Sequence, residues 1–234
     1  MPKEKFMRGF YRFSGRQLLL ALVFLLVAYP FIDDLSWGEF ALSFIITFVL
    51  ISALLAVGGR RGALAIGVLF ILPALTLHWL PHFTTIGKQD TIPVASMALA
   101  IGYTVWQLLR FVLRAPQVDS EVVCSGISVY LLLGLLWAQF YVLVQNADVA
   151  AFYLPFNPAS GHILSTYDAV YFSYSTITTC NFGDIIPASR YARSLATLEE
   201  LCGVLYIAVL IARLMALYTK TTHGTPHALH SAEK

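Results

Sequence analysis

Six stretches of this chain are apolar and long enough to cross a lipid bilayer, and they limit its fold more than any other feature. A membrane-spanning helix needs about 20 predominantly apolar residues. The 234-residue chain is 58% hydrophobic and only 12% charged, which is too apolar for a soluble domain of this size. We therefore predict an all-α integral membrane protein with six transmembrane helices. The predicted spans are 16–33, 39–58, 62–80, 92–113, 122–145 and 191–219.

Basic residues fall on every second connection between these spans, and this pattern predicts the orientation of the chain. They lie in the N-terminal tail, at Arg60 and Arg61, and at the end of the fourth span, where Arg110 and Arg114 are found. By the positive-inside rule, these connections are cytoplasmic. An even number of spans also places both termini on the same side. We predict a multi-pass protein of the cell membrane with cytoplasmic N- and C-termini.

The stretch between the fifth and sixth spans contains a helix that is too short to cross a bilayer. Ser165 followed three residues later by Asp168 forms a capping-box pattern, and the acid suits the positive end of the helix dipole. The predicted helix runs from Tyr167 to about Ile177. Such a segment can enter a membrane only where protein surrounds it, because lipid leaves the polar backbone at its ends unsatisfied. We therefore predict a re-entrant helix.

The run that follows, Thr178-Thr179-Cys180-Asn181-Phe182-Gly183-Asp184, has the features of an ion selectivity filter. An extended backbone points successive carbonyls toward one axis only if alternate residues take left-handed φ, which glycine does most easily. Gly183 fills one such position. Asn181 fills the other, and Asn tolerates the left-handed region better than most residues with a side chain. One strip of carbonyls cannot enclose an ion, so we predict four copies around one axis.

Residues 168–187 resemble the pore loop of potassium channels, whose signature is Thr-Val-Gly-Tyr-Gly-Asp, and the following helix resembles the pore-lining inner helix of bacterial members. The likeness covers about 122–219. It implies a homotetramer that conducts potassium passively across the bilayer. Carried over position by position, the resemblance implies that potassium binds to backbone carbonyls of Thr179, Cys180, Asn181 and Phe182. It implies an outer turn of the filter at Gly183 and a gating hinge at Gly203. The residues implied to support the filter are Thr178, Tyr174 and Asp184.

Asn181, which replaces the first glycine of that signature, leaves the ion selectivity open. A buried amide without a hydrogen-bond partner costs about 1–3 kcal/mol. If Ser175, Tyr174 or a water molecule bonds the Asn181 side chain, we expect preference for potassium. If none does, the alternatives are a weakly selective sodium and potassium channel, or a non-conducting, modulatory channel subunit.

Two adjacent acids, Glu199 and Glu200, lie in the sixth span, where acidic residues are functional candidates by default. Either one would hold cations if it faced the pore cavity. The alternative is a carboxylate that packs behind the short helix and bonds hydroxyls such as Thr176 or Thr178. We favour this packing role for Glu199 and leave Glu200 open between the two.

The first four spans lack the series of basic residues that a voltage sensor requires. Each charge that crosses about 100 mV contributes only about 2.3 kcal/mol, so a sensor needs several of them spaced through one span. The fourth span offers only Arg110 and Arg114 at its end. We therefore expect weak or absent voltage gating by this route. The predicted division is a basic N-terminus (1–16), a four-helix membrane domain (17–114), a pore domain (115–219) and a disordered cytoplasmic tail (220–234).

Other classes of function fit the sequence less well. A carrier would be expected to show internal repeats, and the chain has a single filter-like loop. The spacing of the three cysteines, Cys124, Cys180 and Cys202, is not that of metal ligands. An intramembrane enzyme would be expected to have a cluster of acidic residues and histidines, and we find none in the sequence. We expect no enzymatic activity, no cofactor apart from potassium ions in the filter, and no nucleic-acid partner.

Overall fold

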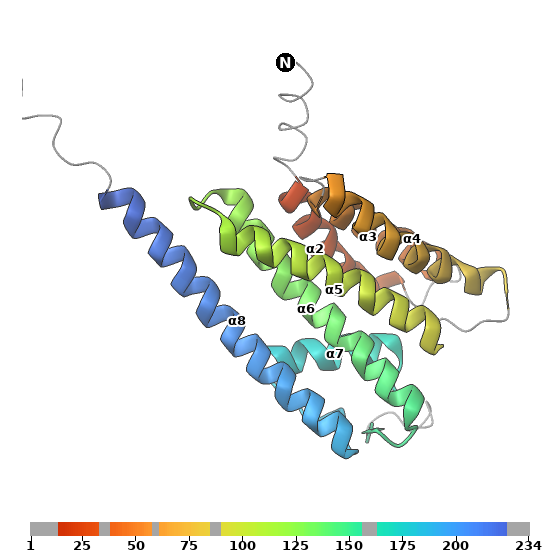
Figure 1. Cartoon of the computed structure of the whole chain (residues 1–234). Helices are drawn as coiled ribbons and strands as arrows, with labels where there is room; N and C mark the ends of the chain where they lie inside the picture. Colours follow the sequence, from red (N-terminus) through yellow and green to blue (C-terminus); the bar gives the residue numbers. More distant parts are fainter. Residues whose placement is uncertain (1–13, 33–37, 58–60, 85–89, 156–162, 224–234) are drawn as a thin grey trace, which may run out of the picture.

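Helices account for most of the chain in the computed structural model, which describes residues 14–32, 38–57, 61–84, 90–155 and 163–223 (Figure 1). A single-turn helix, η1 (Leu80–His82), follows α4. The remaining described helices, labelled as in Figure 1, are α2 (Ser14–Ile32), α3 (Gly38–Val57), α4 (Arg61–Trp79), α5 (Thr91–Arg114), α6 (Ser120–Ala147), the short α7 (Thr166–Ile177) and α8 (Arg190–His223).

Five of these helices, α2, α4, α5, α6 and α8, contain stretches long and apolar enough to cross a membrane. The sequence predicted six. The second predicted span coincides with α3, whose apolar stretch is Phe40–Leu55. Helix α3 as a whole has 20 residues, about 30 Å at 1.5 Å per residue, which is close to the thickness of the hydrocarbon core of a bilayer. The described residues thus form a mostly helical protein with five membrane-span candidates and one further apolar helix, α3.

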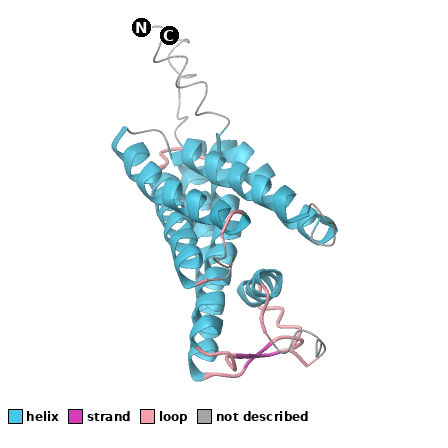
Figure 2. Ribbon diagram, turned by 90° about the vertical axis from the view of Figure 1, so that its right-hand side faces the viewer, coloured by secondary structure: helices cyan, strands magenta, loops and turns pink. Residues whose placement is uncertain are grey.

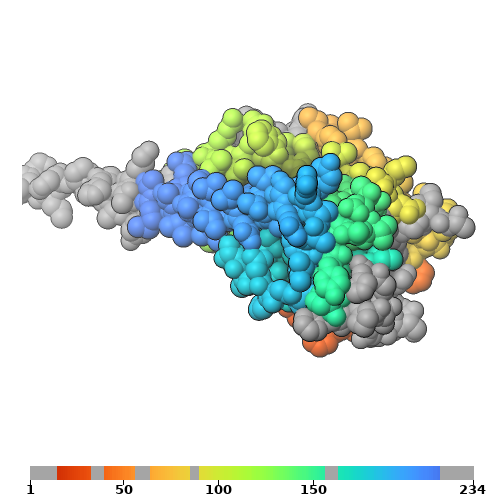
Figure 3. Space-filling model, turned by 90° about the horizontal axis from the view of Figure 1, so that it is seen from below, coloured from red at the N-terminus to blue at the C-terminus, as the bar shows by residue number. Residues whose placement is uncertain are grey.

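Helix α6 lies at the centre of the arrangement. It packs against α2 and α5 on the one hand, and against α7 and α8 on the other. One of two equally large buried clusters joins α2, α3, α5 and α6 through side chains such as Leu22, Val49, Leu108 and Leu132. Seen from below, α8 lies across the face of the molecule with α7 and the end of α6 beside it (Figure 3). The short helix α7 is therefore enclosed by protein contacts from both α6 and α8.

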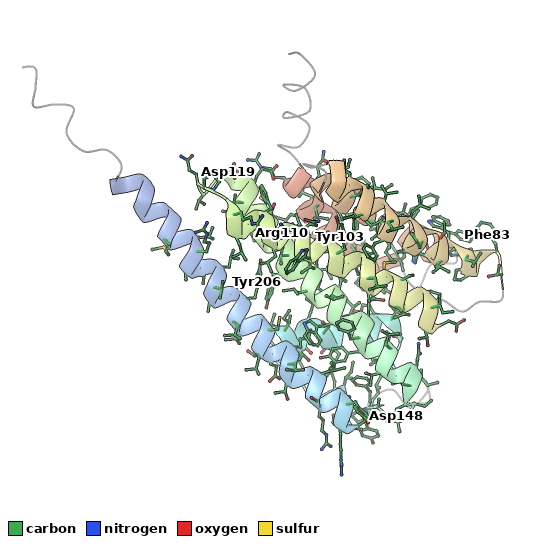
Figure 4. The ribbon with its side chains drawn as sticks, viewed as in Figure 1. Phe83, Tyr103, Arg110, Asp119, Asp148 and Tyr206 are labelled. Atoms are coloured by element: carbon green, nitrogen blue, oxygen red, sulfur yellow. The ribbon has the colours of Figure 1, made fainter. Side chains whose placement is uncertain are left out.

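Specific side chains fix the starts of α6 and α7. Asp119 accepts a hydrogen bond from the Val122 amide at the start of α6, and Figure 4 shows Asp119 and Asp148 at opposite ends of this helix. At the start of α7, the Ser165 hydroxyl accepts from the Asp168 amide and the Asp168 carboxylate accepts from the Ser165 amide. This capping box, predicted from the sequence, is confirmed.

A two-stranded antiparallel ribbon, absent from the all-α prediction, joins the loops on either side of α7. Strand β1 (Phe152–Tyr153) pairs with β2 (Ile186–Pro187), with Phe152 opposite Pro187 and Tyr153 opposite Ile186. The Ala188 amide also donates to the Ala151 carbonyl at 2.8 Å. In Figure 2, α7 is seen nearly end-on with these strands below it. The ribbon ties the chain that leaves residue 184 to the loop after α6.

The predictions made for the two ends of the chain fall only partly within the described residues. The N-terminal residues 1–13 and the C-terminal residues 224–234 lie outside the described ranges. Helix α8 continues to His223, so the first residues of the predicted disordered tail are helical. Between Arg190 and His223 the sequence has no proline and one glycine, Gly203, whereas Gly224 and Pro226 follow directly, as is typical of a helix end.

Candidate functional site

The segment Thr178–Asp184, predicted to form the filter, begins where α7 ends and is held by carbonyls of the last turns of that helix. The Ser175 carbonyl accepts from the Cys180 amide at 2.8 Å and from the Asn181 amide at 3.3 Å. The Thr176 carbonyl accepts from the Thr179 amide at 2.8 Å. The last carbonyls of a helix have no partner within the helix. Here the segment's own amides satisfy three of them, those of Tyr174, Ser175 and Thr176, which fixes its path relative to α7.

The backbone of this segment alternates in handedness. Thr179 has φ of 60°, Asn181 has 42° and Gly183 has 82°, and Thr179 and Asn181 are the non-glycine residues with positive φ among the described residues. The sequence predicted left-handed φ at Asn181 and Gly183. It did not predict it at Thr179, because a β-branched side chain disfavours this region. Every second residue from 179 to 183 is thus left-handed, which turns successive carbonyls toward the same side.

The side chain of Asn181 contacts α8. Its amide nitrogen Nδ2 donates to Glu200 Oε1 at 2.5 Å. The sequence suggested Ser175 or Tyr174 as the partner. Instead, the Ser175 hydroxyl donates a hydrogen bond to the Phe172 carbonyl at 2.8 Å. Glu200, left open between two roles, is half-buried on α8 beside the segment.

Two aromatic rings lie together beside the outer part of the segment. Phe182, which is 69% exposed, stacks on Tyr171 of α7 with ring centroids 6.1 Å apart. The Tyr171 hydroxyl donates a hydrogen bond to the Asp184 carboxylate. This contact ties the acid at the end of the segment to α7.

Tyr174 lies on α7 and anchors that helix to α6. Its hydroxyl donates to the Leu131 carbonyl at 2.7 Å, and its ring fits against Gly134, where an added Cβ would lie 2.6 Å from the ring. Its backbone carbonyl accepts from the Thr178 hydroxyl at 2.6 Å. Tyr174 and Thr178 thus connect α6, α7 and the start of the segment.

Glu199 is completely buried between α6, α7 and α8. Its carboxylate accepts a hydrogen bond from the Tyr141 hydroxyl of α6, and its Oε1 lies 2.5 Å from the Ser173 hydroxyl of α7. The Ser173 hydroxyl also lies 2.7 Å from the Gly134 carbonyl. These partners differ from the expected Thr176 or Thr178. No local pattern pointed to Tyr141, because it lies 58 positions away from Glu199.

Gly203 lies where α8 crosses the end of α7. A Cβ added at this position would be 2.3 Å from the Ile177 carbonyl oxygen, closer than any real side-chain contact. The same carbonyl accepts from the Tyr130 hydroxyl of α6 at 3.1 Å. Gly203 was predicted as a hinge from sequence. Its environment leaves no room for a side chain, because the Ile177 backbone is in direct contact.

Comparison with known proteins identifies this part of the molecule. Residues 129–220, which include α7, the segment and most of α8, match a family model described as an ion channel. The inward rectifier potassium channel Kirbac3.1 of Paramagnetospirillum magnetotacticum is 39% identical over 88 residues. This part of the chain is therefore similar to an ion-channel family and to a potassium channel. The predicted resemblance is therefore confirmed, and the matches are to channels rather than enzymes.

Two further potassium channels extend the comparison. The voltage-gated potassium channel Kch of Escherichia coli (strain K12) is 26% identical over 178 residues, and two-pore potassium channel 1 of Arabidopsis thaliana is 35% identical over 76 residues. The three matches cover 35%, 72% and 32% of this chain but only 28%, 37% and 21% of the respective relatives. The chain therefore spans less than two fifths of each of these potassium channels. No solved structure matches it significantly.

Proposed function

We propose that this protein is a tetrameric cell-membrane channel that conducts potassium passively through a filter formed by Thr179, Cys180, Asn181, Phe182 and Gly183. The alternation of left-handed φ at every second residue from Thr179 to Gly183 carries this proposal. Such alternation brings carbonyl oxygens from successive residues to one side of the strip. Four strips around one axis then replace the water around a dehydrated cation.

The surroundings of α7 support a re-entrant arrangement. At 12 residues, α7 is too short to cross a bilayer, and it packs against both α6 and α8. The polar backbone groups at its two ends are hydrogen-bonded, by the capping box at Ser165 and by the amides that follow Ile177. The negative end of its dipole lies at the start of the filter, where it favours a cation.

Preference for potassium over sodium rests on the hydrogen bond that Asn181 makes. A filter residue whose side chain lacked a partner would loosen the strip. The Glu200 carboxylate supplies a partner for the Asn181 amide, and the Tyr171 and Asp184 side chains brace the outer end. We assign Thr178, Tyr174 and Asp184 to filter support, and we place the six apolar helices in the membrane with cytoplasmic termini.

Reconstitution of the purified protein into liposomes tests the proposal. Vesicles loaded with potassium should lose it rapidly down its gradient, and vesicles loaded with sodium should lose theirs much more slowly. Native mass spectrometry of the same preparation should show four copies. Equal fluxes of the two ions would indicate a weakly selective pore. A tetramer without flux would indicate a modulatory subunit, and either result would contradict the proposal.

A further inference from the structure

Asn181 occupies a backbone position that is unfavourable for a residue with a side chain. Its φ of 42° lies in the left-handed region, which glycine enters freely and Asn tolerates better than most other residues. Its backbone amide is held by the Ser175 carbonyl at 3.3 Å, a long hydrogen bond. The backbone alone therefore holds this residue weakly, and its side chain needs a partner that keeps it out of the conduction path.

Glu200 is that partner. A carboxylate only accepts hydrogen bonds, so the Asn181 side chain must present its NH₂ group to Glu200, with Nδ2 and Oε1 2.5 Å apart. A hydrogen bond to an ionised acceptor is roughly twice as strong as a neutral one. The contact is formed between the strip and the neighbouring helix α8, so it ties the filter backbone to an element with its own fixed position.

Space behind the segment makes this restraint necessary. A cavity of about 350 Å³ is lined by residues from α7, from the segment and from α8, including Ser175, Asn181, Gly183 and Glu200. A side chain freed from Glu200 has room to change its rotamer there, and the backbone of Asn181 can follow it. Glu199 cannot serve the same purpose, because it is fully buried against Tyr141 and Ser173.

We propose that Glu200 is a positioning residue for ion selectivity, and that Asn181 and Glu200 act as a pair that replaces the filter glycine. The carboxylate holds the Asn181 amide, which maintains the left-handed backbone and keeps the carbonyls of residues 179–183 in register. The inference rests on the proposed potassium-selective function. It differs from a cavity role, in which Glu200 would attract cations directly and would not depend on residue 181.

A mutant cycle measured as the potassium-to-sodium permeability ratio in planar bilayers tests the pair. Glu200→Ala should lower the ratio on the order of tenfold, the factor expected for loss of a hydrogen bond to a charged group. Glu200→Gln should lower it less, because the amide oxygen of Gln still accepts. In the Asn181→Gly background the ratio should stay high, and adding Glu200→Ala should then change it little. Asp90→Asn, an exposed acid at the start of α5, is the control for loss of charge.

The outcomes separate this inference from the proposed function. A wild-type channel that does not distinguish potassium from sodium contradicts both. A selective wild-type channel whose ratio is unchanged by Glu200→Ala overturns the pairing alone. An equal loss in the Asn181→Gly background also overturns it, because Glu200 would then act without Asn181. If Glu200→Ala does not assemble, Glu200→Gln measured in both backgrounds decides the question by the same criteria.

Discussion

The four-helix group α2–α5 and the channel-like region α6–α8 differ in the polar contacts added to their apolar cores. One apolar cluster, with Leu22, Val49 and Leu108 among its members, joins α2, α3 and α5 to α6, and a second apolar cluster packs α6 against α7. In α6–α8, hydroxyls also cross between elements. Tyr130, Tyr174 and Tyr206 each donate to a backbone carbonyl of another part of the chain, at 3.1, 2.7 and 2.6 Å.

The difference teaches how each region is specified. Apolar packing is non-directional, so helices that use it can shift slightly without losing much stability. Hydrogen bonds require a distance and an angle, and a buried network fixes one arrangement. Figure 4 shows Tyr206 on α8, whose hydroxyl reaches the Gly126 carbonyl of α6. The region that positions the strip of carbonyls therefore adds several directional contacts to its apolar core.

The largest expected effect follows removal of Glu199 from this network. Glu199→Ala leaves the Tyr141 and Ser173 hydroxyls facing an empty space between three helices. We expect a loss of about 2–5 kcal/mol in the free energy of unfolding, and little assembled protein. Size-exclusion chromatography and thermal unfolding in detergent measure this loss.

Glu199→Gln is the matched control for that experiment. Gln has nearly the same shape, its oxygen accepts from Tyr141, and its NH₂ group can donate to the Ser173 hydroxyl. It should retain most of the assembled protein. If Glu199→Ala proved as stable as wild type, the directional network would not be what holds α6, α7 and α8 together.

A smaller effect is expected at Gly203, where α8 and α7 touch. Gly203→Ala places a methyl group 2.3 Å from the Ile177 carbonyl, and that backbone must shift. Overpacking of this kind costs about 1–3 kcal/mol. The control is Gly102→Ala on α5, whose new methyl would be 3.9 Å from Leu136. That substitution should be neutral or stabilising by up to about 1 kcal/mol, since Ala favours a helix. Equal melting temperatures for the two variants would refute the close contact.

In the four-helix group, loss of a polar contact should affect stability but not selectivity. The Trp79 indole Nε1 donates to the Thr47 hydroxyl at 2.9 Å. Thr47→Val removes the acceptor and should cost about 1 kcal/mol of stability. The potassium-to-sodium permeability ratio should remain that of wild type, because neither residue contacts α7 or the strip. A changed ratio would mean that the two regions are not separable in this way.

The smallest expected effect concerns voltage. Among the residues of α5, Arg110 and Arg114 are the charged side chains, and both lie near its C-terminal end. Neutralising both to Gln should leave the steepness of the current–voltage relation unchanged. A sensor would respond strongly, because each charge that crosses 100 mV is worth about 2.3 kcal/mol. A clear loss of voltage dependence in the double variant would assign α5 a sensing role.

The helices and their ends could largely be predicted from sequence, because the relevant signals are local. The fourth span was expected at 92–113 and α5 is Thr91–Arg114, since a charged or polar residue bounds the apolar run on each side. The start of α7 followed from Ser165 and Asp168, which are three residues apart. Apolar length was also a local signal: the second span was expected at 39–58, and α3 is Gly38–Val57.

Contacts between distant residues could not be predicted in the same way. The ribbon joins Phe152 to Pro187 over two residues on each strand, which is too short to give an alternating pattern. The partner of Asn181 depends on how α8 packs beside the segment, and Glu200 is 19 positions away. Sequence could identify both residues as unusual. It could not show that they meet.

The reversal potential of the purified channel, with potassium on one side of a planar bilayer and sodium on the other, tests the central claim most directly. The account predicts a potential displaced far from zero toward the potassium equilibrium value, because Asn181 keeps its left-handed backbone and the strip stays intact. A potential near zero while current flows would contradict it. That result would mean that the Asn181 position has loosened into a pore that admits hydrated sodium as readily as potassium.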